Sequence, residues 1–204
     1  MHDDGEIKFQ QRHESADPPR AIHLVELRAW RNRLHQWKLL GVHPDGVGYG
    51  NVSHRLPSEG GRTRFAISGT RTGKEDYLWE AAFTTVTDFD VAANLVVSHG
   101  QVRASSESMT HGVLYEADPS IQYVFHVHCP VIWEKRQALD LLETSADVPY
   151  GTPEMADQVR ELFQTTDVVH QRVFAMAGHQ DGLVSFGQTA VEAGSIFRTL
   201  LTHA

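Results

Sequence analysis

Two short stretches of the chain carry residues whose types and spacing suit metal-assisted chemistry. Residues 105–111 contain a serine pair and the carboxylate of Glu107, and residues 123–128 end in a His-x-His pair. In a β-strand, side chains two positions apart point to the same face, so His126 and His128 would project together. Zinc sites that do chemistry usually take three protein ligands and keep one position open. The pair therefore predicts a metal site whose third ligand lies elsewhere, and the C-terminal part of the chain offers a candidate. Taken alone, the pair also fits an exposed strand face or a hydrogen-bonded core pair.

Glycine-rich turns and a helix start offer places for an anion. Residues 46–55 and 64–74 each combine a short β-like run with a glycine-rich polar turn, which makes backbone N–H groups available. Ser105 and Ser106 stand where a helix over residues 106–116 is expected to begin, and free N–H groups at a helix start bind anions. Each feature also has a purely structural interpretation, as a turn or as a helix cap.

Composition limits the kinds of partner. The chain has 204 residues, 41% of them hydrophobic, which is enough for a buried core within the size of one domain. The net charge of −8 argues against a nucleic-acid binder, so an anionic substrate needs local positive groups such as Arg55, Arg71 and Lys74. The single cysteine, Cys129, cannot form an intrachain disulfide, which fits a reducing compartment. Because no membrane-length apolar run and no signal-peptide core is found, we expect a cytoplasmic protein without a membrane partner.

Hydrophobic periodicity divides the chain into a polar arm and one domain. Residues 1–20 have no hydrophobic period and end near a proline pair, so we expect a flexible N-terminal arm, followed by a single domain over residues 21–204. Helices are expected at 22–40, 106–116, 131–142, 153–163 and 189–201. Strands are expected around 88–90 and 98–101, the second at a hairpin tip, and at 121–128 and 173–176. This order predicts a mixed α/β domain.

The order and spacing of the motifs resemble the class II aldolase/adducin family over about residues 22–200. The resemblance rests on Gly-Asn-Val-Ser-x-Arg (50–55), Ile-Ser-Gly-Thr-x-Thr-Gly (67–73), Ser-Ser-Glu-x-x-x-His (105–111), an acid-Pro pair before a strand, His-x-His (126–128), Tyr-Gly-Thr (150–152) and a late His before Gly-Leu-Val-x-Phe-Gly (182–187). It implies a three-layer α/β/α fold with a central, mostly antiparallel sheet. It also implies a homotetramer with sites at subunit interfaces.

The resemblance assigns roles to particular residues. It implies that His126 and His128 are zinc ligands and that Glu107 is a catalytic acid/base near the metal. It implies a cradle for the substrate phosphate made of Gly50, Asn51, Thr72, Gly73, Ser105 and Ser106. His111 lies four residues after Glu107 on the predicted helix, hence on the same face, where it either orients Glu107 or packs.

The third metal ligand departs from the family pattern. In the family a His directly precedes the glycine that corresponds to Gly182, but here that position holds Asp181. His179 lies two residues upstream and would share that face in an extended strand. We expect His179 as the third ligand with Asp181 as the alternative, since carboxylates also bind zinc. Another divalent metal such as iron, manganese or cobalt also suits a mixed His/carboxylate site.

Two further departures concern the substrate. Only 21 residues separate His128 from Tyr150, where the family's aldolases usually have a longer segment with a tyrosine donor, and the C-terminus is short of their tail tyrosine. We expect a zinc-dependent, aldolase-type lyase that acts on a small phosphorylated ketose through an enediolate. The alternatives are an epimerase or dehydratase using the same site on a sugar phosphate, and a non-catalytic module like the adducin head.

Overall fold

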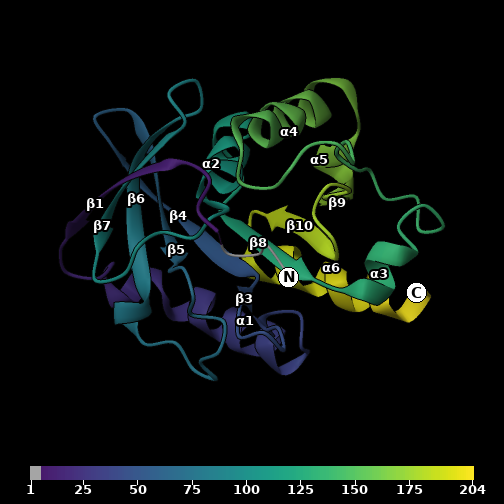
Figure 1. Ribbon diagram of the computed structural model, residues 1–204, viewed down its shortest axis with the longest axis horizontal. Helices are drawn as coiled ribbons and strands as arrows, with labels where there is room; N and C mark the ends of the chain where they lie inside the picture. Colours follow the sequence, from purple (N-terminus) through teal and green to yellow (C-terminus); the bar gives the residue numbers. More distant parts are fainter. Residues whose placement is uncertain (1–5) are drawn as a thin grey trace.

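The computed structural model describes residues 6–204, in which helices cover both faces of one eight-stranded sheet (Figure 1). The strand order is β1-β7-β6-β5-β4-β8-β10-β9. Every neighbouring pair in this sheet is antiparallel except β1 with β7. The expected three-layer α/β/α fold with a mostly antiparallel sheet is therefore confirmed.

The strands of the described part are β1 (Gln10–Ser15), β2 (Gly41–Val42), β3 (Gly48–Tyr49), β4 (Asn51–Glu59), β5 (Arg62–Ser68), β6 (Phe83–Asp90), β7 (Leu95–Gly100), β8 (Tyr123–His128), β9 (Val173–Ala175) and β10 (Gly182–Gly187). Its helices are η1 (Ala21–His23), α1 (Val25–Gln36), η2 (Glu80–Ala82), α2 (Ser108–Ala117), α3 (Pro130–Glu134), α4 (Pro153–Thr165), α5 (Val168–Gln171) and α6 (Ala190–His203). Strands β2 and β3 form a separate small hairpin.

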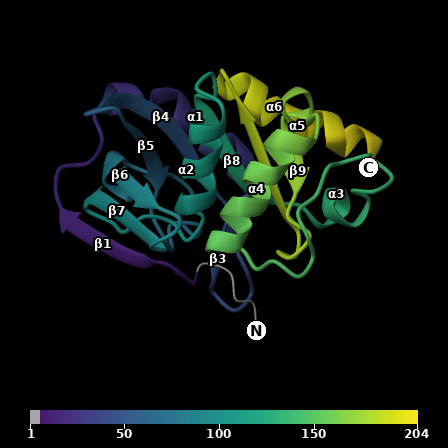
Figure 2. The ribbon, with the colours of Figure 1, turned by 90° about the horizontal axis from the view of Figure 1, so that it is seen from above.

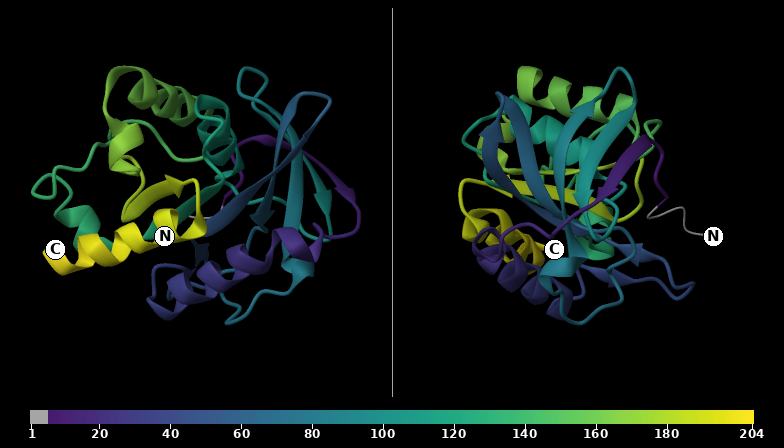
Figure 3. Two further views of the ribbon diagram at one scale, coloured as in Figure 1. Left: turned by 180° about the vertical axis from the view of Figure 1, so that it is seen from behind. Right: turned by 90° about the vertical axis from the view of Figure 1, so that its left-hand side faces the viewer.

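Two hydrophobic cores lie on opposite faces of the sheet. One packs α2 and α4 against the sheet, and the other packs α1 and α6 against it. Figure 2 shows α2 and α4 side by side, and Figure 3 shows α1 and α6 together on the other side. Along β8, Val124 belongs to the first core while Phe125 and Val127 belong to the second. By this alternation, His126 and His128 face the side of α2 and α4.

The ends of three neighbouring strands, β4, β8 and β10, lie together where the histidine pair is located. In the register of the sheet, His126 is opposite Asn51, the first residue of β4. His128 is opposite Gly182, the first residue of β10. Because both partner strands begin where β8 ends, the turns that precede β4 and β10 are brought together beside the two imidazoles.

The expectation of a flexible arm over residues 1–20 is wrong for residues 10–15. They form β1, which pairs in parallel with β7 in the register Gln10↔Leu95 to Ser15↔Gly100 (Figure 3, right). Phe9 just before it is buried in the core beside α2 and α4. A polar edge strand leaves no hydrophobic period, and its parallel partner is distant in sequence, so local pattern could not predict it. Residues 1–5 of the expected arm lie outside the described residues.

Three local expectations also need correction. The helix expected at 131–142 ends at Glu134, because the chain turns after it and Asp140 takes a positive φ of 51°. The hairpin tip expected at 98–101 is instead the C-terminal end of β7, which finishes at Gly100, and the turn between β6 and β7 lies at residues 91–94. The short helix α5 was not expected. Among residues 6–204, no helix combines the length and apolar character that a membrane span requires.

Candidate active site

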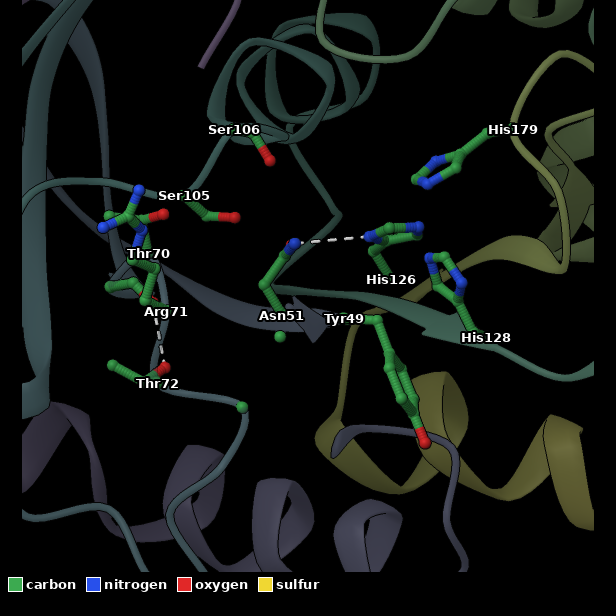
Figure 4. Close-up of a pocket in the computed structure, with 14 residues that line it drawn as sticks. Tyr49, Asn51, Thr70, Arg71, Thr72, Ser105, Ser106, His126, His128 and His179 are labelled. Atoms are coloured by element: carbon green, nitrogen blue, oxygen red, sulfur yellow. Dashed lines mark hydrogen bonds between the residues drawn. The ribbon is translucent and has the colours of Figure 1, made fainter. Parts of the chain in front are cut away.

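One pocket gathers most of the residues expected to do chemistry. Its wall consists of residues 48–51, 69–73 and 105–106 together with His126, His128 and His179 (Figure 4). Every residue expected to bind phosphate is on this wall. The glycine turns, the serine pair that precedes α2 and the histidine pair, which are far apart in the sequence, therefore form one site.

The three histidines can hold a metal ion. One ring nitrogen from each of His126, His128 and His179 lies within 4.8 Å of the others. The ring centroids are 5.0 Å apart for His126 with either partner and 4.7 Å apart for His128 with His179. All three side chains are buried, with at most 5% of any residue exposed. Three imidazoles that converge in this way form a donor set suited to zinc.

The third histidine comes from a turn rather than from an extended strand. The N–H of His179 donates to the carbonyl of Met176, and the N–H of Gly182 donates to the carbonyl of His179. Asp181 takes a φ of 66° in this turn, and its carbonyl accepts from the N–H of Cys129. The turn brings His179 to the histidine pair, and the cluster of possible ligands does not include Asp181.

His126 is placed and kept neutral by its surroundings. The side-chain amide of Asn51 lies 3.2 Å from Nδ1 of His126. Burial lowers the pKa of His126 well below the usual value, and the nearby His179 and His128 lower it further. Within residues 6–204, Nε2 of His126 and Oδ1 of Asn51 are buried without a hydrogen-bond partner. Turning the amide over lets Oδ1 accept from Nδ1–H, which leaves the lone pair of Nε2 for a cation.

These residues fit a divalent transition metal. The ligand set is nitrogen-only and buried, and a neutral imidazole is the form that binds a cation. A cation would give Nε2 of His126 a partner, which is favourable because a buried polar atom without a partner is costly. The fit is to a class of metals, and zinc is one member.

Close backbone approach builds the end of the pocket expected to bind phosphate. A Cβ on Gly73 would lie 2.1 Å from the carbonyl oxygen of Gly41, and one on Gly50 would lie 2.2 Å from the Leu40 side chain. Gly50 also has a φ of 74°. Only glycine allows these turns to pack where they do, with their backbone facing the pocket.

Arg31 of α1 holds the turn that contains Gly73 through hydrogen bonds to its backbone. Its guanidinium donates to the carbonyls of Thr72 and Asp76, at 3.2 and 3.1 Å. The hydroxyl of Thr72 donates to the carbonyl of Gly69 at 2.8 Å, which closes the turn from within. A buried arginine with carbonyl partners fixes the loop, and sequence reasoning missed it because the residue looks like any polar position of α1.

Glu107 is buried and is not among the residues that line the pocket. It is the residue before α2, is 1% exposed, and accepts a hydrogen bond at Oε2 from the Thr110 hydroxyl at 2.9 Å. Gly151 approaches closely here, since a Cβ on it would lie 2.8 Å from the Ser106 carbonyl. The pocket wall includes Ser105 and Ser106, and Glu107 follows them directly in the chain.

His111 does not orient Glu107 through its side chain. Its Nδ1 lies 2.6 Å from the hydroxyl of Ser53, which lies 2.7 Å from the hydroxyl of Tyr115. Complete burial lowers the pKa of His111 to about 3. Of the two interpretations offered for this residue, packing within a buried polar network is the one observed.

The three basic residues considered for anion binding lie in different places in the structure. Arg71 lines the pocket, with a φ of 61°. Arg55 donates to the carbonyls of Ile121, Tyr115 and Asp118 and so belongs to the fold. Lys74 is exposed and lies 3.9 Å from Glu75.

Two tyrosines flank the histidines, and neither was assigned a role from the sequence. The Tyr49 ring lies 5.3 Å from that of His128, and the Tyr150 ring stacks on His179 at 4.3 Å and an interplanar angle of 24°. Tyr150 stands inside a motif used for the resemblance and Tyr49 directly precedes one, so their positions were visible while their contacts were not.

Comparison with known proteins places the chain in a family. The model of the Class II Aldolase and Adducin N-terminal domain matches residues 43–202, and the chain belongs to this family. No match was found among curated proteins. The fold is similar to that of an L-fuculose 1-phosphate aldolase, with a TM-score of 0.64 and 18% identity over 91% of this chain and 84% of that one.

Two further solved structures have the same fold. An L-fuculose-1-phosphate aldolase from Thermus thermophilus has a TM-score of 0.61 and 20% identity over 89% of this chain and 90% of its own. YgbL from Escherichia coli, described as a candidate aldolase/epimerase/decarboxylase, has a TM-score of 0.59 and 19% identity over 89% of this chain and 86% of its own.

The buried state of His111 predicts a loss of stability in acid. Its folded pKa of about 3 lies below the 6.5 of an unperturbed histidine, so the unfolded chain takes up the proton first as the pH falls. The stabilisation is complete above about pH 6.5 and is lost below it at about 1.4 kcal/mol per pH unit. In metal-free protein, His111→Gln should lose about 2 kcal/mol less unfolding free energy than the parent between pH 7 and pH 5, measured by urea denaturation.

His170→Gln is the matched control, because His170 is exposed. It should follow the parent at both pH values. An equal loss in parent and His111→Gln would contradict the buried, neutral state of His111.

Proposed function

We propose that this protein is a zinc-dependent, aldolase-type lyase that acts on a small phosphorylated ketose. The observation that carries this proposal is that the three-histidine cluster and the glycine and serine cradle line one pocket. Each motif alone has a structural interpretation. Their meeting in one pocket suits a small substrate that has both an anionic group and metal-binding oxygens.

The two ends of the pocket suggest how such a substrate lies. In Figure 4, Thr70, Arg71, Thr72 and Ser105 lie on one side of Asn51 and the three histidines lie on the other. The phosphate would lie at the first end, beside the Arg71 guanidinium and the turn backbones. The carbonyl and a neighbouring hydroxyl would then reach the histidines.

Glu107 is the proposed proton carrier. A bound divalent cation supplies Lewis-acid stabilisation of the negative charge that develops on the substrate oxygens. In the cleavage direction, the hydroxyl on the carbon that becomes the aldehyde loses its proton to solvent and forms a C=O bond, and the electron pair of the broken C–C bond remains with the ketone fragment as an enediolate. The Glu107 carboxyl then gives a proton to its carbon, and in the condensation direction the carboxylate removes that proton.

Epimerisation or dehydration of a sugar phosphate is the second candidate. Either reaction would use the same pocket. The segment between His128 and Tyr150 is short for an aldolase, and this favours retaining the alternative. Product analysis on a panel of pentulose and deoxyhexulose phosphates separates these outcomes. An adducin-like module without catalysis is the third candidate, and the intact histidine cluster counts against it.

The remaining assignments rest on the family. We propose zinc as the native metal, a homotetrameric assembly and a cytoplasmic location. We also propose that residues 21–204 belong to one domain. Strand β1 (Gln10–Ser15) extends that domain to the N-terminal side, because it pairs in the same eight-stranded sheet as β9 and β10.

Removing the proton carrier and removing a ligand should have different effects. Glu107→Gln keeps the size of the side chain but cannot exchange the proton, so turnover should fall by at least about 100-fold while metal is retained. His126→Ala should lose the metal itself. Turnover of phosphorylated ketoses and metal content by elemental mass spectrometry are measured on both. Full activity in a metal-free His126→Ala protein would refute this mechanism.

Disturbing the phosphate end should affect substrate binding. In Gly73→Ala the new methyl group would meet the Gly41 carbonyl, so the turn must move, and KM for a phosphorylated ketose should rise at least about tenfold. Lys74→Ala changes the next, exposed residue and should leave KM unchanged. Equal KM values for Gly73→Ala and the parent would mean that this turn does not bind the phosphate.

A further inference from the structure

The N-terminal segment of residues 6–15 lies outside the family match, which begins at residue 43. It nevertheless reaches the ring that stacks on His179. The N–H of Glu6 donates to the hydroxyl of Tyr150 at 3.3 Å, and Nζ of Lys8 lies 3.8 Å from the centre of the Tyr150 ring. The segment therefore touches the site through Tyr150.

Contacts at Lys8 and at the two residues that follow it hold this segment in place. The side-chain amide of Asn94 donates to the Lys8 carbonyl at 3.1 Å, and the N–H of Gln10 donates to the Asn94 carbonyl at 2.8 Å. Phe9 is buried in the core, and β1 begins at the next residue. The backbone at Lys8 is thus held beside the sheet, and this places the Lys8 side chain within reach of the Tyr150 ring.

Tyr150 is held between Lys8 and His179. The imidazole of His179 is 4.3 Å from the ring centre and the amine of Lys8 is 3.8 Å from it. Because both groups lie so close to the centre of the Tyr150 ring, we infer that the His179 imidazole covers one face of the ring and the Lys8 amine covers the other. A cation over an aromatic face is attracted to it, and the aromatic ring in turn limits how the imidazole can rotate.

The turn that carries His179 also depends on this neighbourhood. Gly178 packs so closely that a Cβ there would lie 2.1 Å from the carbonyl oxygen of Val148. Residues 148–150 therefore press on the turn at Gly178 and on the ring at His179. Because His179 comes from a turn rather than from a strand, its position depends on such contacts more than on sheet register.

We propose that Tyr150 is a positioning residue for the third metal ligand and that the N-terminal segment of residues 6–15 fixes Tyr150 through Lys8. This inference rests on the proposed function only in that the three histidines bind a metal. Groups that orient a ligand from outside typically change metal affinity 10- to 100-fold when removed. By this proposal, a segment outside the family match helps to position the histidine at which the sequence departs from the family pattern.

Zinc affinity of the full-length protein tests this, measured by competition with a chelating indicator. Tyr150→Leu should bind zinc at least about tenfold more weakly, whereas Tyr150→Phe keeps the stacked ring and should stay within about threefold of the parent. Lys8→Ala should weaken binding about threefold, and Lys8→Arg should restore it, because both cations can lie over the ring. Arg12→Ala is the matched control, since Arg12 lies on β1 of the same segment, away from these contacts.

Two further readouts separate positioning from general stability. The visible absorption of the cobalt-loaded protein should change in Tyr150→Leu and not in Tyr150→Phe. The Tm of the metal-free protein reports any loss of fold. A Tyr150→Leu protein with a lowered metal-free Tm but parental zinc affinity would overturn the inference.

The inference and the proposed function fail differently. If the parent takes up no zinc and no cobalt, both are wrong. If the parent binds zinc and Tyr150→Leu binds it equally well, the metal site stands and the role of Tyr150 is wrong. If Tyr150→Leu is weakened but Lys8→Ala matches Arg12→Ala, the contribution of the N-terminal segment is refuted.

Discussion

Three imidazoles buried with ring nitrogens within 4.8 Å of one another are the constraint on which the site depends. Protonating one of these imidazoles would place a charge in a buried site beside the other two imidazoles. Burial therefore lowers the pKa of His126 and keeps it neutral. Neutral imidazoles retain the lone pairs that a metal ion needs. A divalent cation suits that arrangement, and the sheet supplies its rigidity because β8 is hydrogen-bonded on both sides by β4 and β10.

Close approach by glycine connects this metal end to the anion end. Gly50 lets the start of β4 pass beside the carbonyl of His126, and Gly73 lets its turn lie against Gly41. Arg31 secures that turn from α1 by donating to two of its carbonyls. The result is one pocket in which the proposed phosphate donors and the proposed metal ligands are fixed relative to each other, and such positioning would contribute to the proposed catalysis.

The sequence predicted what depends on local period and on motif order. The His126 and His128 pair, the glycine turns and the serine pair at α2 are local patterns, and the structure brings them to one pocket. The sequence could not predict β1, because its parallel partner β7 lies about 85 residues further along the chain, as in the pair His13↔Ser98. The sequence named His179 as the expected third ligand but did not predict the turn that carries it, in which Asp181 takes a positive φ. The stack of Tyr150 is likewise a tertiary contact.

Metal content per chain is the most direct test of this account. It should be measured by elemental mass spectrometry on untagged protein purified without chelator. We predict close to one equivalent of zinc or another divalent transition metal per chain, held by three nitrogen ligands. A folded protein that is metal-free and also fails to take up added zinc would contradict the central claim and favour an adducin-like binding module.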